Sequence, residues 1–262
     1  MTLGDDLLLL AVHPRSGRVH RPERMDLVLR AAELLELLLA GRIGVTSGRP
    51  RIVVESAAPT ADRRLDTVLR LLGEASPAPT VGEWLKRSSR GTTLSYLSRL
   101  EGQGALTVDR RAKRYAGSPA PITLLDRARR ADLRRRVAGA AGDPERTAAD
   151  HALAALVNTA GLSRRLYRGP HRRPLRRRLA RLAESAPLAL GAVAALVPGD
   201  AELAAAISEA VSTGVRELNS QLSKELRAEH RMEDAAGGHH GHHGSGGHHG
   251  HGGGHGGYGG EP

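Results

Sequence analysis

The chain has 262 residues, enough for one large domain or two small ones, and no cysteine, which excludes disulfides, zinc–thiolate sites and thiol catalysis. Its formal charge of +11 and its pI of about 11.0 indicate an anionic partner: a nucleic acid, a phosphate-bearing ligand or an anionic lipid surface. Only three basic residues are lysines, so arginine carries nearly all of the charge, and part of this basicity reflects the codon bias of a GC-rich genome.

The first ten residues, MTLGDDLLLL, place acidic residues before a short apolar run, and they lack the basic segment of a secretory signal. The longest apolar stretch without a charged residue, from Ser185 to Gly199, is too short to span a bilayer and contains proline and glycine. The sequence therefore predicts a soluble cytoplasmic protein.

The first predicted elements are a helix over residues 5–12 and then a turn with a short strand in HPRSGRVHRP. A leucine-rich helix follows over residues 24–40 and ends at Gly41 as its C′ residue. Its polar residues, at steps of four, three and three, are Asp26, Arg30, Glu33 and Glu36. Four charges exclude a membrane span. On a helix they form one narrow stripe that we expect to face water, with apolar residues around the rest. This is the expected core helix.

The middle of the chain alternates short strands and helices. Residues 43–55 predict a hairpin around Ser47-Gly48, and residues 61–75 predict an amphipathic helix. Two more helices, TVGEWLKRSSR and GTTLSYLSRLEGQG, are expected to meet near residues 88–91. The segment ALTVDRRAKRYAG predicts a second hairpin, which turns at Arg110 to Ala112.

The C-terminal half is predicted to be wholly helical, beginning with ITLLDRARRADLRRRVAGA. The next helix has Asp143 as its N-cap, Pro144 in its first turn and Gly161 as its C-cap. Three further helices are expected in RPLRRRLARLAES, in the apolar LALGAVAALV and over residues 200–230.

Past Ala235 the composition changes to glycine and histidine, with eight histidines between His239 and His255. Such a segment cannot bury a core and is expected to be disordered. Paired imidazoles bind Ni²⁺, Zn²⁺ or Cu²⁺ readily, but we interpret that affinity as incidental and expect no cofactor. The predicted organisation is a globular domain over residues 1–235 and a tail over residues 236–262.

The sequence contains no P-loop, no GxGxxG after a strand, no GxSxG and no HExxH. Most acidic residues lie beside arginines along helices, a pattern typical of solvated faces. We therefore expect no enzyme activity and no catalytic residues.

Residues 164–181 hold nine arginines and His171 but no acidic residue. Such a run forms either a solvated face or a patch that faces a membrane or nucleic acid, because uncompensated like charges repel without a counter-anion. The arginines at 127, 129, 130 and 134–136 lie near Asp126 and Asp132, and we interpret them as mainly solvated.

Residues 80–117 also fit a second hypothesis, a winged-helix DNA-binding protein with a helix, a turn, a recognition helix and a wing. The groove contacts would come from Arg87, Arg90, Thr92, Thr93 and Arg99, and the phosphate contacts from Arg110, Arg111, Lys113 and Arg114. The supposed recognition helix offers few side chains that read bases, so nucleic acid is the less favoured partner.

Five segments resemble the Golgi phosphoprotein 3 family in order and spacing, over roughly residues 3–225. They are LGDDLLLLAV, AAELLELLLAGRI, TVGEWLKRSSR, YLSRLEGQGALT and DPERTAADHALAALVNTAG. The resemblance implies a mainly α fold: a single globular helical domain around a buried central helix, with small β-hairpins.

Eukaryotic members of that family are peripheral membrane proteins that bind phosphatidylinositol 4-phosphate and the cytoplasmic tails of Golgi glycosyltransferases. A hairpin contributes to their self-association, and it corresponds here to residues 104–117. The composition suggests that this chain would be a bacterial member of the family, from an actinobacterium. The resemblance therefore implies an adaptor on the inner face of the membrane, which binds anionic lipid headgroups, tails of membrane enzymes and a second copy of itself.

The resemblance also implies a set of lipid-phosphate-binding residues. Alignment on AGRI gives Arg30, and alignment on GALT gives Arg90 and Thr93, the latter where the family has a basic residue. The family's membrane-inserting tryptophan has no counterpart here, and its position falls near Arg21. Arg87 completes the set. Trp84 matches a different tryptophan of the family, one with a structural role. From spacing alone, ion pairs with Asp26 and Glu33 are the favoured explanation of Arg30.

Overall fold

The structure is a computed structural model that describes residues 2–20, 22–46, 51–86, 91–110 and 121–194, together with the isolated helical residues Ser220 and Lys224. For residues 22–24, 86 and 184–194 only the backbone is described. Every element below lies in one compact unit, Met1–Leu226, whereas the second unit, Arg227–Pro262, lies outside the described residues. The predicted division at residue 235 and the disorder of the tail therefore stay predictions.

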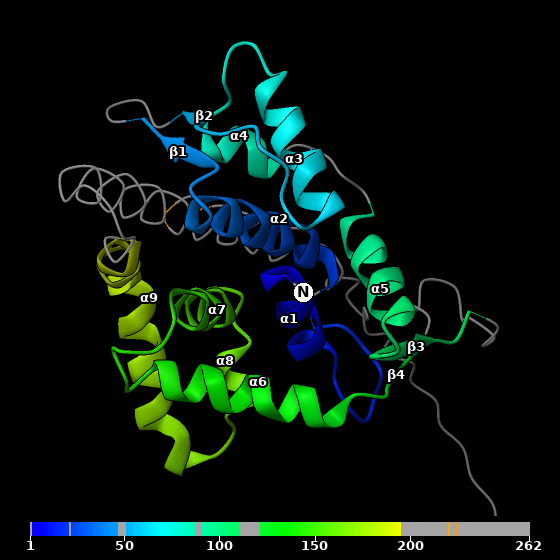
Figure 1. The fold of residues 1–262 in the computed structure, drawn as a ribbon. Helices are drawn as coiled ribbons and strands as arrows, with labels where there is room; N and C mark the ends of the chain where they lie inside the picture. Colours follow the sequence, from blue (N-terminus) through cyan, green and yellow to red (C-terminus); the bar gives the residue numbers. More distant parts are fainter. Residues whose placement is uncertain are drawn as a thin grey trace, which may run out of the picture. The chain divides into compact units, whose positions relative to one another are not determined.

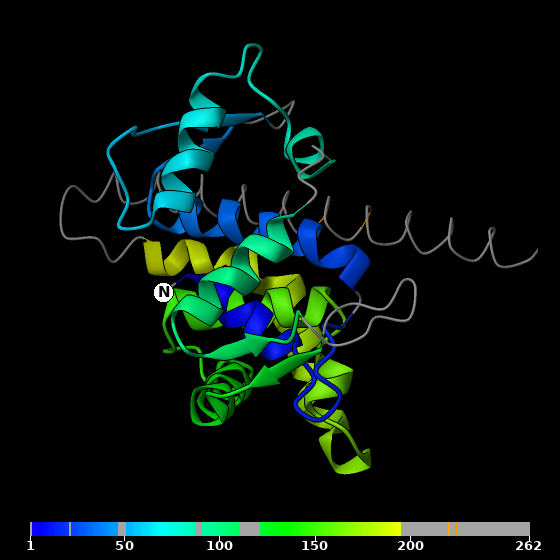
Figure 2. The same cartoon turned by 90° about the vertical axis from the view of Figure 1, so that its right-hand side faces the viewer.

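Within the described residues the fold is mainly helical, with two small antiparallel sheets, as predicted (Figures 1 and 2). The elements in chain order are α1 (Leu3–Ala11), α2 (Pro22–Leu39), β1 (Ile43–Val45), β2 (Ile52–Val54), α3 (Arg63–Gly73), α4 (Val81–Lys86), α5 (Thr92–Gly102), β3 (Leu106–Val108), β4 (Ile122–Leu124), α6 (Arg127–Ala140), α7 (Ala148–Thr159), α8 (Ser163–Leu166), the 3₁₀ turn η1 (Pro170–Arg172) and α9 (Arg173–Ala194).

The leucine-rich helix α2 is the predicted core helix. It contacts α1, α3, α4, α5, α7 and β1 (Figure 1), and its apolar side chains from Met25 to Leu38 are buried. It ends as predicted at Gly41, whose φ is 63°. The next amide, that of Arg42, donates to the Leu37 carbonyl at 2.9 Å, so the left-handed glycine closes the helix.

The first helix, α1, is buried on nearly every side because it lies between α2, α5, α6 and α7. A capping box joins Thr2 and Asp5 and satisfies the first free amides. Gly4 is required by close packing: a Cβ there would come within 2.5 Å of the Tyr96 ring of α5. An alanine at position 4 would therefore separate α1 from α5.

The polar stripe of α2 does not face water, which corrects the prediction. Arg30 is 7% exposed and Glu33 2%, and Asp26 and Glu36 are half-buried. Asp26 accepts from the backbone N–H of Thr93 at 2.7 Å, and Glu36 accepts from that of Leu3 at 3.0 Å. The stripe is therefore an internal set of connections between α2 and its neighbours.

Each connection fits the polarity of the helix end that it binds. Asp26 and Glu36 accept amides at the N-termini of α5 and α1, where N–H groups lack partners within the helix. Arg30 donates to carbonyls at the C-terminal end of α4, and Glu33 pairs with Arg64 in the first turn of α3. The stripe thus holds the ends of four helices against the core helix.

An antiparallel sheet forms at each predicted hairpin, but the second sheet uses a strand that was not predicted. Ile43 pairs with Val54 in the first, and its predicted turn at Ser47-Gly48 lies outside the described residues. In the second, β3 pairs with β4, Leu106 with Leu124 (Figure 2). Strand β4 lies beyond the end of the predicted hairpin segment at Gly117. Two of the three residues of the turn predicted at Arg110 to Ala112 lie outside the described residues, so that turn stays a prediction.

Three details of the C-terminal half differ from prediction. Residues 122–124 form strand β4 and not the start of a helix. Helix α7 begins after Thr147, whose side chain accepts a hydrogen bond from the backbone N–H of Asp150, and not at Asp143. The end of α7 at Gly161 was predicted correctly. Helix α9 runs through Pro187 to Ala194, so RPLRRRLARLAES and the start of LALGAVAALV form one helix. Most of the helix predicted over residues 200–230 lies outside the described residues.

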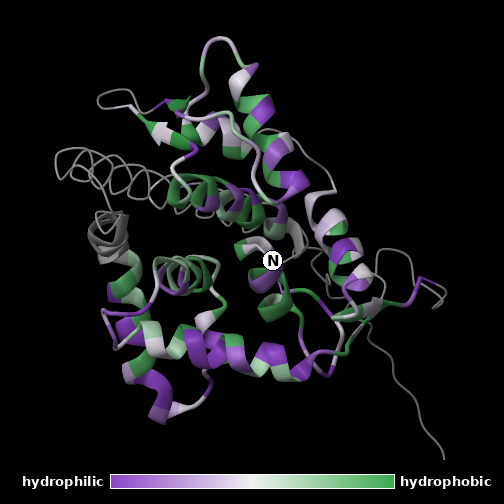
Figure 3. Cartoon of the chain, viewed as in Figure 1, coloured by the Kyte–Doolittle hydropathy of each residue, from purple (hydrophilic) through white to green (hydrophobic). Residues whose placement is uncertain are grey.

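Figure 3 shows apolar residues concentrated on α2 and α7 and hydrophilic residues along α6. In the part of the chain that the structure describes, no helix combines the length and apolar character needed to cross a bilayer.

The buried carboxyl of Glu36 gives a prediction about pH. Burial raises its pKa from 4.5 to about 7; the Leu3 amide opposes this shift, and Asp62 and Asp5 add to it. Between these two values the folded state binds more protons than the unfolded state, so the contribution of Glu36 to the free energy of unfolding falls as pH rises. Above pH 7, Glu36→Gln should raise the free energy of unfolding by about 1 to 2 kcal/mol, allowing for solvent screening.

Urea denaturation across this pH range measures the effect. The exposed carboxylate Glu74, replaced by glutamine, is the control and should leave the wild-type profile unchanged. A Glu36→Gln profile parallel to that of wild type would contradict the assignment.

Candidate functional site

Two of the five residues assigned to lipid phosphate, Arg30 and Thr93, lie in the described part of the chain. The other three, Arg21, Arg87 and Arg90, lie outside it. Arg30 Nη1 donates to the carbonyls of Leu85 at 2.8 Å and Trp84 at 3.3 Å. Its guanidinium is therefore held by the last turn of α4, and not by intrahelical ion pairs alone.

Thr93 is held by Asp26 of α2 through both its backbone amide and its hydroxyl. Together with the Arg30 contact, this brings the first turns of α2 close to the end of α4 and the start of α5. Arg21 precedes α2 by one residue, Arg87 follows α4 and Arg90 stands two residues before α5. Arg21, Arg87 and Arg90 thus lie in the sequence within two residues of the ends of α2, α4 and α5, and the described contacts hold these helix ends together.

The same contacts weigh against the winged-helix hypothesis. Thr92 is buried, Thr93 is bound to Asp26, and Arg99 forms ion pairs with Asp5 at 2.9 Å and Asp62 at 2.5 Å. These residues were expected to contact a DNA groove, yet Thr93 joins α5 to α2, and Arg99 joins α5 to α1 and to the cap of α3. Among the proposed phosphate contacts, Arg110 pairs with Glu101 at 2.6 Å, and residues 111, 113 and 114 lie outside the described residues.

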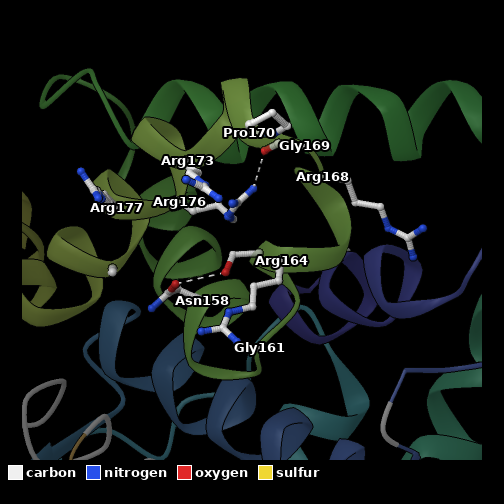
Figure 4. Close-up of a pocket in the computed structure, with 11 residues that line it drawn as sticks. Asn158, Gly161, Arg164, Arg168, Gly169, Pro170, Arg173, Arg176 and Arg177 are labelled. Atoms are coloured by element: carbon white, nitrogen blue, oxygen red, sulfur yellow. Dashed lines mark hydrogen bonds between the residues drawn. The ribbon is translucent and has the colours of Figure 1, made fainter.

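A second cluster forms a pocket of about 1060 Å³ beside α7, α8 and α9 (Figure 4). Its arginines come from α8, from the turn after it and from α9, and are Arg164, Arg168, Arg173, Arg176 and Arg177. We call this the α8–α9 arginine pocket. None of the residues described as lining it is acidic. It lies within the acid-free run 164–181 that the sequence identified.

Uncharged groups orient part of the lining of this pocket. Arg176 Nη1 donates to the carbonyls of Tyr167 at 2.6 Å and Gly169 at 3.1 Å (Figure 4). On the opposite side, the Ser163 hydroxyl donates to the Asn158 side-chain oxygen at 3.2 Å. A backbone carbonyl orients a guanidinium without neutralising it, so Arg176 keeps its full charge for an anion.

The arginines of α6 were expected to be mainly solvated; Arg127, Arg134 and Arg135 are exposed, whereas Arg129, Arg130 and Arg136 are only partly exposed. Arg129 pairs with Asp6 at 2.7 Å, and Arg136 pairs with Asp150 at 2.7 Å. Arg130 and Arg134 instead donate to backbone carbonyls. The helical spacing of four between Arg130 and Arg134 could have indicated this separate face.

Among the described residues, no group of three or more histidines, aspartates and glutamates could hold a metal ion. The histidine-rich tail lies outside those residues, and its incidental affinity for nickel, zinc or copper stays a prediction.

The comparison with protein families decides the identity of the domain. The family model described as Golgi phosphoprotein 3 (GPP34) matches residues 3–218. The chain belongs to the Golgi phosphoprotein 3 family. Among curated proteins, none matches the chain significantly. The predicted resemblance is thus confirmed, and both the ends joined by α2 and the α8–α9 arginine pocket lie inside the Golgi phosphoprotein 3 domain.

The contacts of Arg30 predict a large structural effect. Arg30→Met would leave the Leu85 and Trp84 carbonyls without this donor, and hydrogen bonds to a charged group contribute about 1.5–3 kcal/mol each. The free energy of unfolding in urea should fall by about 2–4 kcal/mol.

The exposed Arg127→Met is the control, and it should change the free energy of unfolding by less than about 0.5 kcal/mol. Equal stabilities of the two variants would contradict the structural role of Arg30.

Proposed function

We propose that this protein is a peripheral membrane adaptor that binds anionic phospholipid headgroups, in the manner of a phosphatidylinositol 4-phosphate-binding protein. Members of the Golgi phosphoprotein 3 family are generally non-catalytic and associate with membranes through phosphoinositides. The observation that carries the proposal is the α8–α9 arginine pocket, which five arginines line without a carboxylate among the described lining residues.

Charge and exposure support this role. Arg164, Arg168, Arg173 and Arg177 are exposed, so a flat anionic surface can reach them. Each basic residue close to an anionic membrane contributes about 1 kcal/mol of binding. A cluster of this size therefore suffices for reversible attachment to an anionic membrane.

Specificity for the headgroup would come from the family-aligned residues. In this proposal Arg21, Arg87 and Arg90 contact the phosphate from the ends of α2, α4 and α5, while Arg30 and Thr93 hold these ends together. The contacts of Asp26 with Thr93 and of Arg30 with Leu85 support the proposal, since they bring the flanking chain segments near one another. The amides at the start of α5 add a favourable field for an anion.

The proposed location is the cytoplasmic, inner face of the membrane. Cytoplasmic tails of membrane enzymes are the proposed protein partners. Residues 104–117, with the tip of the second hairpin, are the proposed contact between copies. Part of this segment, residues 104–110, is described, and it is anchored through the bonds of Glu101 to Val108 and Arg110.

Vesicle co-sedimentation tests the role of the arginine pocket. The triple variant Arg164→Gln, Arg173→Gln and Arg177→Gln should bind phosphatidylcholine vesicles containing about 20 mol% phosphatidylserine at least tenfold more weakly than wild type. The difference should shrink at high salt, because these charges are exposed.

The charge-matched control is Arg63→Gln, Arg70→Gln and Arg135→Gln, three exposed arginines on α3 and α6. Its binding should stay much closer to that of wild type. In a second arm, Arg90→Gln should reduce the preference for phosphatidylinositol 4-phosphate over phosphatidylserine at equal surface charge. Wild-type protein that binds anionic and neutral vesicles equally would overturn the proposal.

A further inference from the structure

A second cavity, of about 590 Å³, lies between the end of α1, the following turn, helix α6 and the segment from Leu162 to Arg172. Six arginines line it: Arg15, Arg130, Arg134, Arg165, Arg168 and Arg172. Two histidines, His13 and His171, complete its basic groups, and no acidic residue is among the described residues around it. It shares only Arg168 with the α8–α9 arginine pocket.

From this arrangement we infer that the cavity is a second anion site, distinct from the family-aligned lipid residues, that takes a phosphate-bearing ligand with more than one negative charge. We call it the α1–α6 cavity. Its volume lies in the range of sites for small molecules and headgroups. Arginine forks suit phosphate oxygens because two parallel N–H groups can donate to one phosphate.

The partners of the α6 arginines separate this cavity from the rest of the surface. Arg129 and Arg136, on one side of α6, are neutralised by Asp6 and Asp150. Arg130 and Arg134 face the cavity and donate instead to the carbonyls of Leu10 at 3.3 Å and Leu166 at 2.7 Å. These two guanidinium groups are therefore fixed in direction while their charge stays uncompensated.

Arg130 has capacity for a further acceptor. Its Nε is buried and has no hydrogen-bond partner in the described structure. A buried donor without a partner costs free energy, and because this atom is buried a phosphate oxygen reaches it only when the Arg130 side chain turns toward the cavity. Arg134 is further fixed against the Tyr167 ring at 5.9 Å, and the Tyr167 hydroxyl donates to the Arg134 carbonyl at 2.6 Å. Arg134 is thus held against Tyr167 and Leu166 before any ligand binds.

The opposite wall is also held in place. His13 Nδ1 accepts from the Ser16 amide at 3.1 Å, so the neutral ring carries its proton on Nε2 and is a donor there. Gly17, at φ 61°, donates to the His13 carbonyl, and its own carbonyl accepts from Ile122 of β4. A Cβ at Gly17 would approach the Ile122 carbonyl to 2.3 Å, so only glycine lets the turn lie against the sheet.

The electrostatic state of His13 agrees with an anion site. Desolvation and then the charges of Arg165, Arg168, Arg130 and Arg15 lower the pKa of His13 below 6.5. The positive potential of the cavity therefore reaches the ring, which at pH 7 is neutral and adds a donor without further repulsion.

Calorimetry on the full chain with inorganic pyrophosphate, in metal-free buffer at physiological salt, tests the inference. Wild type should bind pyrophosphate saturably with one site. Arg165→Gln with Arg172→Gln, both exposed and absent from the α8–α9 arginine pocket, should bind at least tenfold more weakly. The charge-matched control Arg63→Gln with Arg135→Gln should bind like wild type, and all three proteins should keep the same Tm.

Vesicles of phosphatidylcholine with phosphatidic acid then identify the source of the phosphate. If they displace pyrophosphate, the ligand is a lipid headgroup; if pyrophosphate binds equally in their presence, it is a soluble phosphorylated molecule. Either result supports the site. Absence of saturable pyrophosphate binding, or equal weakening in both double variants, would overturn it. Neither of these two results depends on binding to phosphatidylserine vesicles. Failure of the α1–α6 cavity can therefore be distinguished from failure of the adaptor proposal.

Discussion

The fold depends on four charged side chains that one buried helix directs at the ends of its neighbours. Asp26, Arg30, Glu33 and Glu36 of α2 bind, in turn, the start of α5, the end of α4, the first turn of α3 and the start of α1. Helix ends carry backbone groups that the helix itself cannot satisfy, and burying them is costly without partners. The apolar faces of α2 make the core, and its polar stripe decides how four helices begin or end against it.

The arginines that carry the large positive charge fall into two groups, according to the partner that holds each side chain. Arg99, Arg129 and Arg136 are paired with carboxylates and connect elements. Arg130, Arg134 and Arg176 are oriented by backbone carbonyls, which leave their charge uncompensated. Desolvation and the neighbouring Arg134 even lower the pKa of Arg130. Anion binding is proposed where the arginines held by backbone carbonyls are concentrated, on both sides of α8. The net charge alone would not indicate this location.

Hydrophobic periodicity was sufficient to predict the core helix, its end at Gly41, most other helices and the two small sheets. It failed where tertiary contacts override local pattern. The stripe on α2 has the spacing of a solvated face, and only the three-dimensional arrangement shows that helix ends cover it. Strand β4 was missed because residues 109–121 separate it from its partner β3 and because it leads directly into α6. The pair Asp143-Pro144 has the sequence of a helix start, but Thr147 is the residue that caps α7. The acid-free run of residues 164–181 did indicate the α8–α9 arginine pocket. The α1–α6 cavity takes part of its lining from the same run, but the other parts come from two distant segments, and the sequence does not show that these segments meet.

Hydrogen exchange of the full chain, measured by mass spectrometry with anionic and with neutral vesicles, tests most directly whether carbonyl-held arginines mark the membrane-facing surface. With anionic vesicles, exchange should slow in the segment from Gly161 to Arg178, which contains α8 and the start of α9. Exchange in α3 and in the β1–β2 sheet should stay unchanged. Slower exchange confined to α3 and that sheet, with none between Gly161 and Arg178, would contradict the account.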